Sequence, residues 1–115
     1  MIIEIDMGGA PESEFCRDFI VGMAKRMAMS YYKYGLVSDA YPHKVDAVRS
    51  LQARLDKYAQ TGNTEYLMDA GNFAMIEFMH PKHPDAYFEA TDSVKSPGRA
   101  FYGEVDRSQR GNKEL

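Results

Sequence analysis

The chain has 115 residues, of which 44% are hydrophobic and 27% charged, and its formal net charge is -3 at pH 7. This size and balance are typical of one globular domain and unlike those of a disordered chain. The negative net charge argues against nucleic acid as a general partner, because phosphate backbones are bound by basic surfaces. We predict a single domain over residues 1–103 and a flexible tail over residues 104–115.

The sequence also predicts a reducing, cytoplasmic location without a membrane partner. No window approaches the roughly 20 consecutive apolar residues that cross a bilayer. Glu4 and Asp6 interrupt the first residues, which therefore do not resemble a secretory signal. Cys16 is the only cysteine and lies in an apolar pattern, so we expect a buried thiol and no internal disulfide.

Isoleucines near the N-terminus alternate in part with acidic residues, which indicates a short extended arm that Gly8 and Gly9 end. Residues 11–34 are predicted to form a helix, because large apolar side chains recur every four residues. These side chains are Phe15, Phe19, Met23, Met27 and Tyr31. Gly35 is suited to ending this helix.

A second helix is predicted over residues 42–60, with Pro42 in its first turn, after a connection over residues 36–41. A third is predicted over residues 65–79, after a turn at residues 61–63, with Asn63 or Thr64 as its cap. Beyond it, the prolines favour irregular structure. The predicted fold is mainly all-α, a bundle of three to four helices with an extended N-terminal arm and an irregular C-terminal tail.

The third predicted helix is apolar almost all round, which is typical of a buried helix, yet it carries Glu65, Asp69 and Asn72 in one narrow arc. Buried carboxylates need a compensating partner. A hard cation such as Mg²⁺ is one such partner, because it prefers oxygen ligands. The alternative is that Glu65 lies in water, while Asp69 and Asn72 bond Arg49 or Arg54 of the preceding helix.

The segment TEYLMDAGNFA at residues 64–74 resembles the metal-binding helix of MazG-like all-α nucleotide pyrophosphohydrolases. The segment RLDK at residues 54–57 is similar to an Arg-x-x-Asp-Lys motif on the preceding helix of one branch of that family. The resemblance covers at most residues 45–79. It implies a dimeric or tetrameric bundle that uses Mg²⁺ to cleave nucleoside triphosphates to a monophosphate and pyrophosphate.

By position, the resemblance implies metal-ligand roles for Glu65 and Asp69. It also implies that Asn72, Arg54 and Lys57 bind the substrate. Such enzymes use a second acidic pair, usually Glu-x-x-Glu, and this chain contains no Glu-x-x-Glu. We therefore expect a nucleotide-binding protein with an incomplete metal site, in which hydrolysis remains open.

A second resemblance leads to an alternative function. Residues 63–79, with the His-Pro segment that follows, are similar to small phage and actinobacterial proteins without an assigned activity. This resemblance implies a non-catalytic interaction or sequestering protein. A further pattern stays open: Tyr31, Tyr32 and Tyr34, with Lys25 and Lys33, can contact a nucleotide, although aromatic residues at helix ends usually belong to cores or interfaces.

Overall fold

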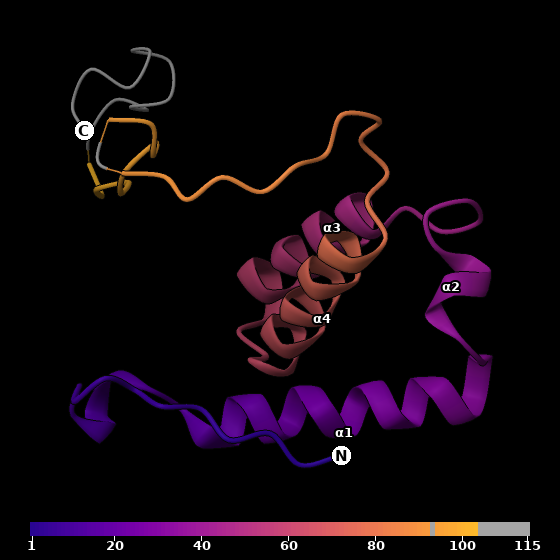
Figure 1. Cartoon of the computed structure of the whole chain (residues 1–115), viewed down its shortest axis with the longest axis horizontal. Coiled ribbons are helices and arrows are strands. Elements are labelled where there is room, and N and C mark those ends of the chain that lie inside the picture. The colour runs from indigo at the N-terminus through magenta and orange to yellow at the C-terminus, as the bar shows by residue number, and fades with distance from the viewer. Residues whose placement is uncertain (93, 104–115) are drawn as a thin grey trace. The chain divides into compact units, whose positions relative to one another are not determined.

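The computed structural model of the chain describes residues 1–92 and 94–103, and within these residues it is helical (Figure 1). The described residues contain four α-helices, one short 3-10 helix and no strand, which confirms the predicted mainly all-α fold. The 3-10 helix is Glu12–Glu14, and the α-helices are α1 (Arg17–Tyr34), α2 (Val37–Ala40), α3 (Ala47–Thr61) and α4 (Glu65–Met79).

The chain divides into two units, Met1–Pro84 and Asp85–Leu115. Every helix of the described residues belongs to the first unit, while residues 85–92 and 94–103 form neither helix nor strand. The predicted tail over residues 104–115 lies outside the described residues. Within those residues, no helix is long and apolar enough to cross a membrane.

Helix α1 begins at Arg17, six residues later than predicted. The chain first makes the 3-10 turn, and Phe15 and Cys16 then adopt extended backbone angles that separate it from α1. The helix ends as predicted, because Gly35 takes a positive φ of 88° that a residue with a side chain rarely adopts. Cys16 is exposed rather than buried as expected, since it precedes the part of α1 that contacts α4.

Helix α3 begins at Ala47 instead of Pro42. The preceding residues form a turn in which the Lys44 and Val45 N–H groups both donate to the carbonyl of Ala40. The Asp46 carboxylate then accepts a 3.1 Å hydrogen bond from the backbone N–H of Arg49, which caps the first turn of α3. This cap, rather than the proline, sets the start of the helix.

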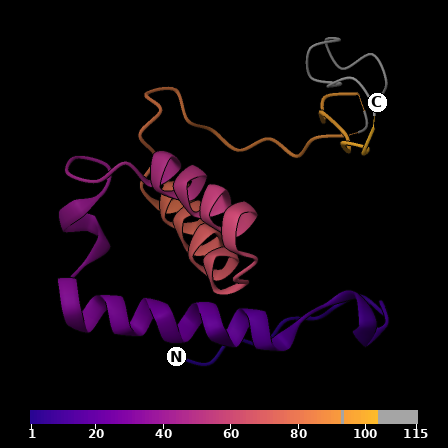
Figure 2. The same ribbon diagram turned by 180° about the vertical axis from the view of Figure 1, so that it is seen from behind.

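Helix α4 has the predicted bounds, and α3 and α4 lie side by side as an antiparallel pair (Figures 1 and 2). Gly62, with a left-handed φ of 74°, ends α3 and turns the chain. The Asn63 side chain accepts a 3.0 Å hydrogen bond from the backbone N–H of Glu65, so Asn63 rather than Thr64 stabilises the start of α4.

Helix α1 crosses α4 where both helices carry glycine. A Cβ atom on Gly22 would lie 2.6 Å from the Met68 sulfur, and one on Gly71 would lie 3.0 Å from the Met23 sulfur. A side chain at either position would have to displace the flexible end of the facing methionine. Two glycines in helix interiors cost stability by themselves, and here they leave room for Met68 and Met23 between the helices.

The core of this unit is small. Among the described residues, the only buried hydrophobic ones are Ala47, Ala70 and Ile76, and no large side chain is fully buried. Helix α4 was expected to be buried all round, yet Phe78 near its C-terminal end is 75% exposed. The difference arises because α1 covers only the first half of α4, around Gly71.

Candidate functional site

A cluster of ion pairs joins three helices around Asp69. Arg26, from α1, donates from Nε to Asp69 Oδ1 at 2.5 Å and from Nη2 to Oδ2 at 3.2 Å. This is the two-pronged geometry that a guanidinium forms with a carboxylate. The Asp69 side chain is 17% exposed, so water screens these contacts only in part. The hydrogen bond to Asp69 raises the pKa of Arg26, against the opposing effect of burial.

A second arginine reaches the same carboxylate from the neighbouring helix. Arg54, on α3, donates from Nε to Asp69 Oδ2 at 3.3 Å. Its guanidinium carbon also lies 5.2 Å from the centre of the Phe73 ring, within the range of a cation–π contact. Asp69 therefore connects α1, α3 and α4, and the sequence-based alternative that Arg54 bonds Asp69 is confirmed.

The predicted metal ligands do not fit a Mg²⁺ site in this arrangement. Arg26 bridges both of them, because its Nη1 lies 3.2 Å from Glu65 Oε1 while its other nitrogens hold Asp69. A cation would have to displace this guanidinium and would still face Arg54. Within residues 1–92 and 94–103, no three His, Cys, Asp or Glu side chains group closely enough to hold a metal ion.

Asn72 attaches α4 to α1. Its side-chain Nδ2 donates a 3.0 Å hydrogen bond to the backbone carbonyl of Met23, and the residue is 6% exposed. This bond replaces the expected contact with an arginine of the preceding helix. The carbonyl of Met23 can only accept, so the orientation of the amide is determined and its Oδ1 is left buried without a hydrogen-bond partner.

A pocket of about 380 Å³ lies beside this cluster. Its lining combines positive charge with aromatic rings: the charged members are Arg26, Lys33, Arg54 and Asp69, and the aromatic members are Tyr34, Tyr41 and Phe73. Three cations against one carboxylate leave the lining with an excess of positive charge. The volume lies within the range of small-molecule sites.

Tyr41 contributes a neutral phenol to this pocket. Burial raises the pKa of Tyr41, although the nearby charge of Arg54 opposes the change. The hydroxyl therefore keeps its proton at neutral pH and can donate to an anion or accept from an N–H group. Tyr41 reaches the pocket because the turn after α2 brings it there, whereas the sequence pattern predicted only a connection at this position.

The other predicted residues are divided between this pocket and the surface. Arg54 and Asn72 line the pocket, as do Lys33 and Tyr34 at the end of α1, whereas Lys57 is exposed and is not part of the lining. Arg26 was missed by the sequence analysis. One sequence feature could have identified Arg26. It is a basic residue three positions after Met23 and next to Met27, at the edge of the apolar stripe of α1.

The fold and the cluster thus define a small helical protein with a cationic, partly aromatic pocket between its helices. No family model matches the chain, and no curated protein or solved structure gives a match either.

Proposed function

We propose that the chain binds a phosphate-bearing aromatic molecule, of the nucleotide class, in the pocket beside Asp69. The observation that carries this proposal is the combination of Arg26 and Arg54 with three aromatic rings in one volume of about 380 Å³. Guanidinium groups bind phosphate through paired N–H donors, and aromatic faces stack on bases. The resemblance of α4 to MazG-like proteins is consistent with this class of ligand.

The two arginines already hold a carboxylate, which suggests how a phosphate would enter. Arg54 makes one contact of 3.3 Å to Asp69, which is long for a charge-assisted hydrogen bond. Its remaining N–H groups have no partner in Asp69. Arg54 can therefore turn toward a ligand at lower cost than Arg26, which makes two contacts to Asp69 and a third to Glu65.

The proposal is limited to binding, because the cluster does not provide for hydrolysis. Activation of a water molecule needs a free general base or a metal ion. Both carboxylates of the cluster face Arg26, and the geometry does not fit Mg²⁺. Binding without turnover agrees with a sequestering role.

The test is a calorimetric titration with nucleoside mono-, di- and triphosphates, with and without Mg²⁺, beside the matching nucleoside. We expect the phosphorylated forms to bind and the nucleoside to bind more weakly. Arg54→Gln should weaken binding roughly tenfold to a hundredfold, the loss of one charge-assisted contact. The control, Arg49→Gln, removes an exposed arginine of the same helix that does not line the pocket.

Equal binding of the nucleoside and its phosphates would contradict the proposal. A parallel screen for pyrophosphate release, comparing the parent with Asp69→Ala, tests the enzymatic alternative. Release that needs both Mg²⁺ and Asp69 would show that the cluster opens to admit a metal, and the restriction to binding would then be wrong.

A second candidate function is protein interaction, and the exposed apolar side chains favour it. Helix α4 alone exposes Met75, Phe78 and Met79 by 38% to 75%. Single exposed apolar residues are ordinary, but a contiguous group on a soluble protein usually marks an interface. This role does not compete with the pocket, which opens on other residues.

A further inference from the structure

The positive charge that the pocket presents to a ligand is small. Its lining contains three cations and one carboxylate, which leaves two net positive charges; the cations are Arg26, Lys33 and Arg54, and the carboxylate is Asp69. Glu65 is not part of the lining, but its Oε1 lies 3.2 Å from Arg26 Nη1 and reduces the charge available to a ligand further. The number of phosphate groups that the pocket can hold is therefore limited.

The two arginines differ in the donors that they can offer to a phosphate. All three nitrogens of Arg26 already contact a carboxylate, with Nε and Nη2 at Asp69 and Nη1 at Glu65. Arg54 donates to Asp69 from Nε alone. Because a guanidinium binds one phosphate group through two parallel N–H donors, the two terminal nitrogens of Arg54 provide for a single phosphate.

Lys33 is the remaining cation of the lining, and it lies further along α1. Seven positions separate it from Arg26, which is about 10 Å along a helix axis. Its Nζ lies 5.1 Å from the centre of the Tyr34 ring, which also lines the pocket. An ammonium group beside an aromatic ring can donate to a ring nitrogen or carbonyl oxygen of a base that stacks there. Lys33 is therefore better placed for the base than for a second phosphate.

We infer that the pocket selects a nucleoside monophosphate, bound without a metal ion, over the corresponding di- and triphosphate. The inference rests on the proposed function and names the class of nucleotide. A phosphate monoester has a charge between about -1.5 and -2 at pH 7, which the two net positive charges of the lining offset. Each further phosphate adds negative charge close to Asp69 and Glu65, and such a juxtaposition of like charges weakens binding.

A metal ion ordinarily offsets the charge of a longer phosphate chain. Mg²⁺ is held by one or two carboxylates together with the phosphates of the substrate. Here Arg26 contacts both Glu65 and Asp69, so neither carboxylate is available to a metal. The inferred ligand therefore differs from the triphosphate that the resemblance to MazG-like proteins implies.

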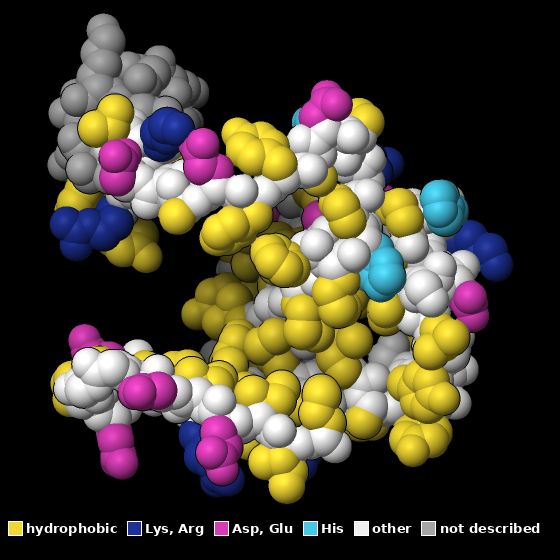
Figure 3. All heavy atoms as spheres, viewed as in Figure 1, with side chains coloured by type: hydrophobic (Ala, Val, Ile, Leu, Met, Phe, Trp, Pro, Cys, Tyr) yellow, Lys and Arg dark blue, Asp and Glu magenta, His cyan; other side chains and the backbone are white. Residues whose placement is uncertain are grey.

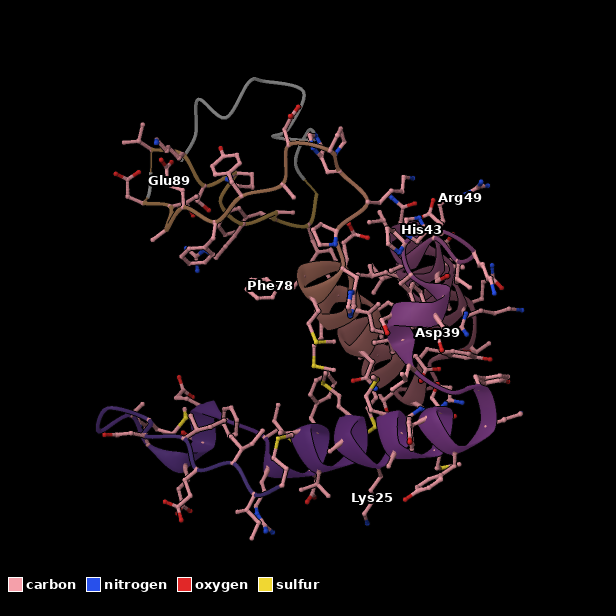
Figure 4. The ribbon with its side chains drawn as sticks, turned by 45° about the vertical axis from the view of Figure 1, so that its right-hand side comes forward. Lys25, Asp39, His43, Arg49, Phe78 and Glu89 are labelled. Atoms are coloured by element: carbon pink, nitrogen blue, oxygen red, sulfur yellow. The ribbon has the colours of Figure 1, made fainter. Side chains whose placement is uncertain are left out.

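The surroundings of the pocket add little positive charge. Lys25 points from α1 away from α3 and α4, Arg49 projects outward from the start of α3, and neither lines the pocket (Figure 4). On the face of the helical unit seen in Figure 3, hydrophobic side chains predominate, while Lys and Arg side chains occur near Asp and Glu at its edges. The whole chain has a net charge of -3, and its field disfavours the more highly charged anion.

The test is a calorimetric titration of the full chain with the mono-, di- and triphosphates of adenosine, guanosine, cytidine and uridine, in EDTA and again in Mg²⁺. For the base that binds best, the monophosphate should bind about tenfold more tightly than the triphosphate in EDTA. The diphosphate should fall between them. Mg²⁺ should leave the dissociation constant of the monophosphate unchanged, because no metal takes part in its binding.

Two different failures can be distinguished in these titrations. A triphosphate that binds as tightly as the monophosphate, in either buffer, would overturn the inference and leave the proposed function in place. If no phosphorylated form binds better than its nucleoside, the proposed function itself is wrong, and the inference fails with it.

Glu65→Gln tests whether charge causes the preference. This change removes a negative charge beside Arg26 and frees Arg26 Nη1, and the Glu65 side chain is 57% exposed, so the fold should tolerate it. The triphosphate should gain more affinity than the monophosphate, and the ratio of their dissociation constants should narrow several-fold.

The matched control is Asp56→Asn. Asp56 is exposed, does not line the pocket, and lies two positions after Arg54, so at 100° per residue it faces the opposite side of α3. Its ratio should stay that of the parent. A ratio that does not change in Glu65→Gln, or that narrows equally in both variants, would show that the charge of the pocket does not set the preference and would overturn the inference.

Discussion

The two halves of α4 are held by different forces. The first half lies against α1, and its Asp69 contacts two arginines. The second half lies only against α3, where Ile76 is buried, and its polar contacts run through Lys82, which donates to Glu77 at 2.7 Å and to Asp46 at 2.9 Å, with both contacts exposed to water. The sequence is apolar along the whole helix. The difference shows that an apolar helix is buried only where another element covers it.

This comparison predicts that the polar cluster dominates the stability of the first half. Asp69→Asn removes the charge between Arg26 and Arg54 and leaves two partly buried guanidinium groups facing each other. We expect a loss of about 2–3 kcal/mol in the free energy of unfolding, measured by chemical denaturation. Asp56→Asn, an exposed carboxylate of α3, is the control and should change it by less than about 0.5 kcal/mol.

The close crossing of α1 and α4 should be the next most sensitive feature. Gly22→Leu introduces a side chain where even a Cβ atom would lie 2.6 Å from Met68. Met68 is flexible, so part of the overlap can relax, and we expect a loss of about 1–2 kcal/mol. Ala28→Leu tests an exposed position of the same helix. If both variants are equally stable, α1 does not pack on α4 in this way.

The start of α4 offers a smaller effect. Asn63→Ala removes the side-chain acceptor of the Glu65 N–H, and loss of such a cap costs about 0.5–1 kcal/mol. Amide hydrogen exchange should show faster opening of the first turn of α4 and unchanged protection in α3. Protection that falls equally in both helices would mean that the pair unfolds as one unit from this end.

The smallest effect concerns pH and the second half of α4. Hydrogen bonds from Lys82 and from the Arg49 backbone N–H lower the pKa of Asp46 in the folded chain. A carboxyl group with a lowered pKa stabilises the fold above its unfolded pKa, near 3.8, and this stabilisation is lost as pH falls through the lower folded value. Melting temperatures below about pH 4 should therefore decline less steeply for Asp46→Asn than for the parent.

The local structure of this protein followed from its sequence wherever a backbone signal was strong. Gly35 and Gly62 ended helices as expected, because both adopt backbone angles that glycine favours. The bounds of α4 were confirmed. The starts of α1 and α3 were wrong because Glu12–Glu14 forms a separate turn and the Asp46 side chain, not Pro42, caps α3.

The residues around Asp69 could be predicted from the sequence only in part. The unusual acidic arc of α4 was visible, and Arg54 was recognised as a partner for Asp69, since both residues lie on adjacent helices joined by a short turn. Arg26 and Tyr41 were missed, because residues 43 and 28 positions away in sequence from Asp69 come close only through the packing of α1 and the turn after α2.

The sequence by itself determined the three long helices, their order, and the presence of carboxylates on an apolar helix, because these depend on periodicity and local hydrogen bonding. It did not determine α2, which lies in the segment predicted as a connection. Tertiary structure decided what those carboxylates contact and which half of α4 is covered. Both depend on the angle at which α1 crosses α4 at Gly22 and Gly71, and such long-range packing is not encoded in any single helix. That crossing brings Arg26 of α1 to the cationic pocket and leaves Met75, Phe78 and Met79 of α4 exposed.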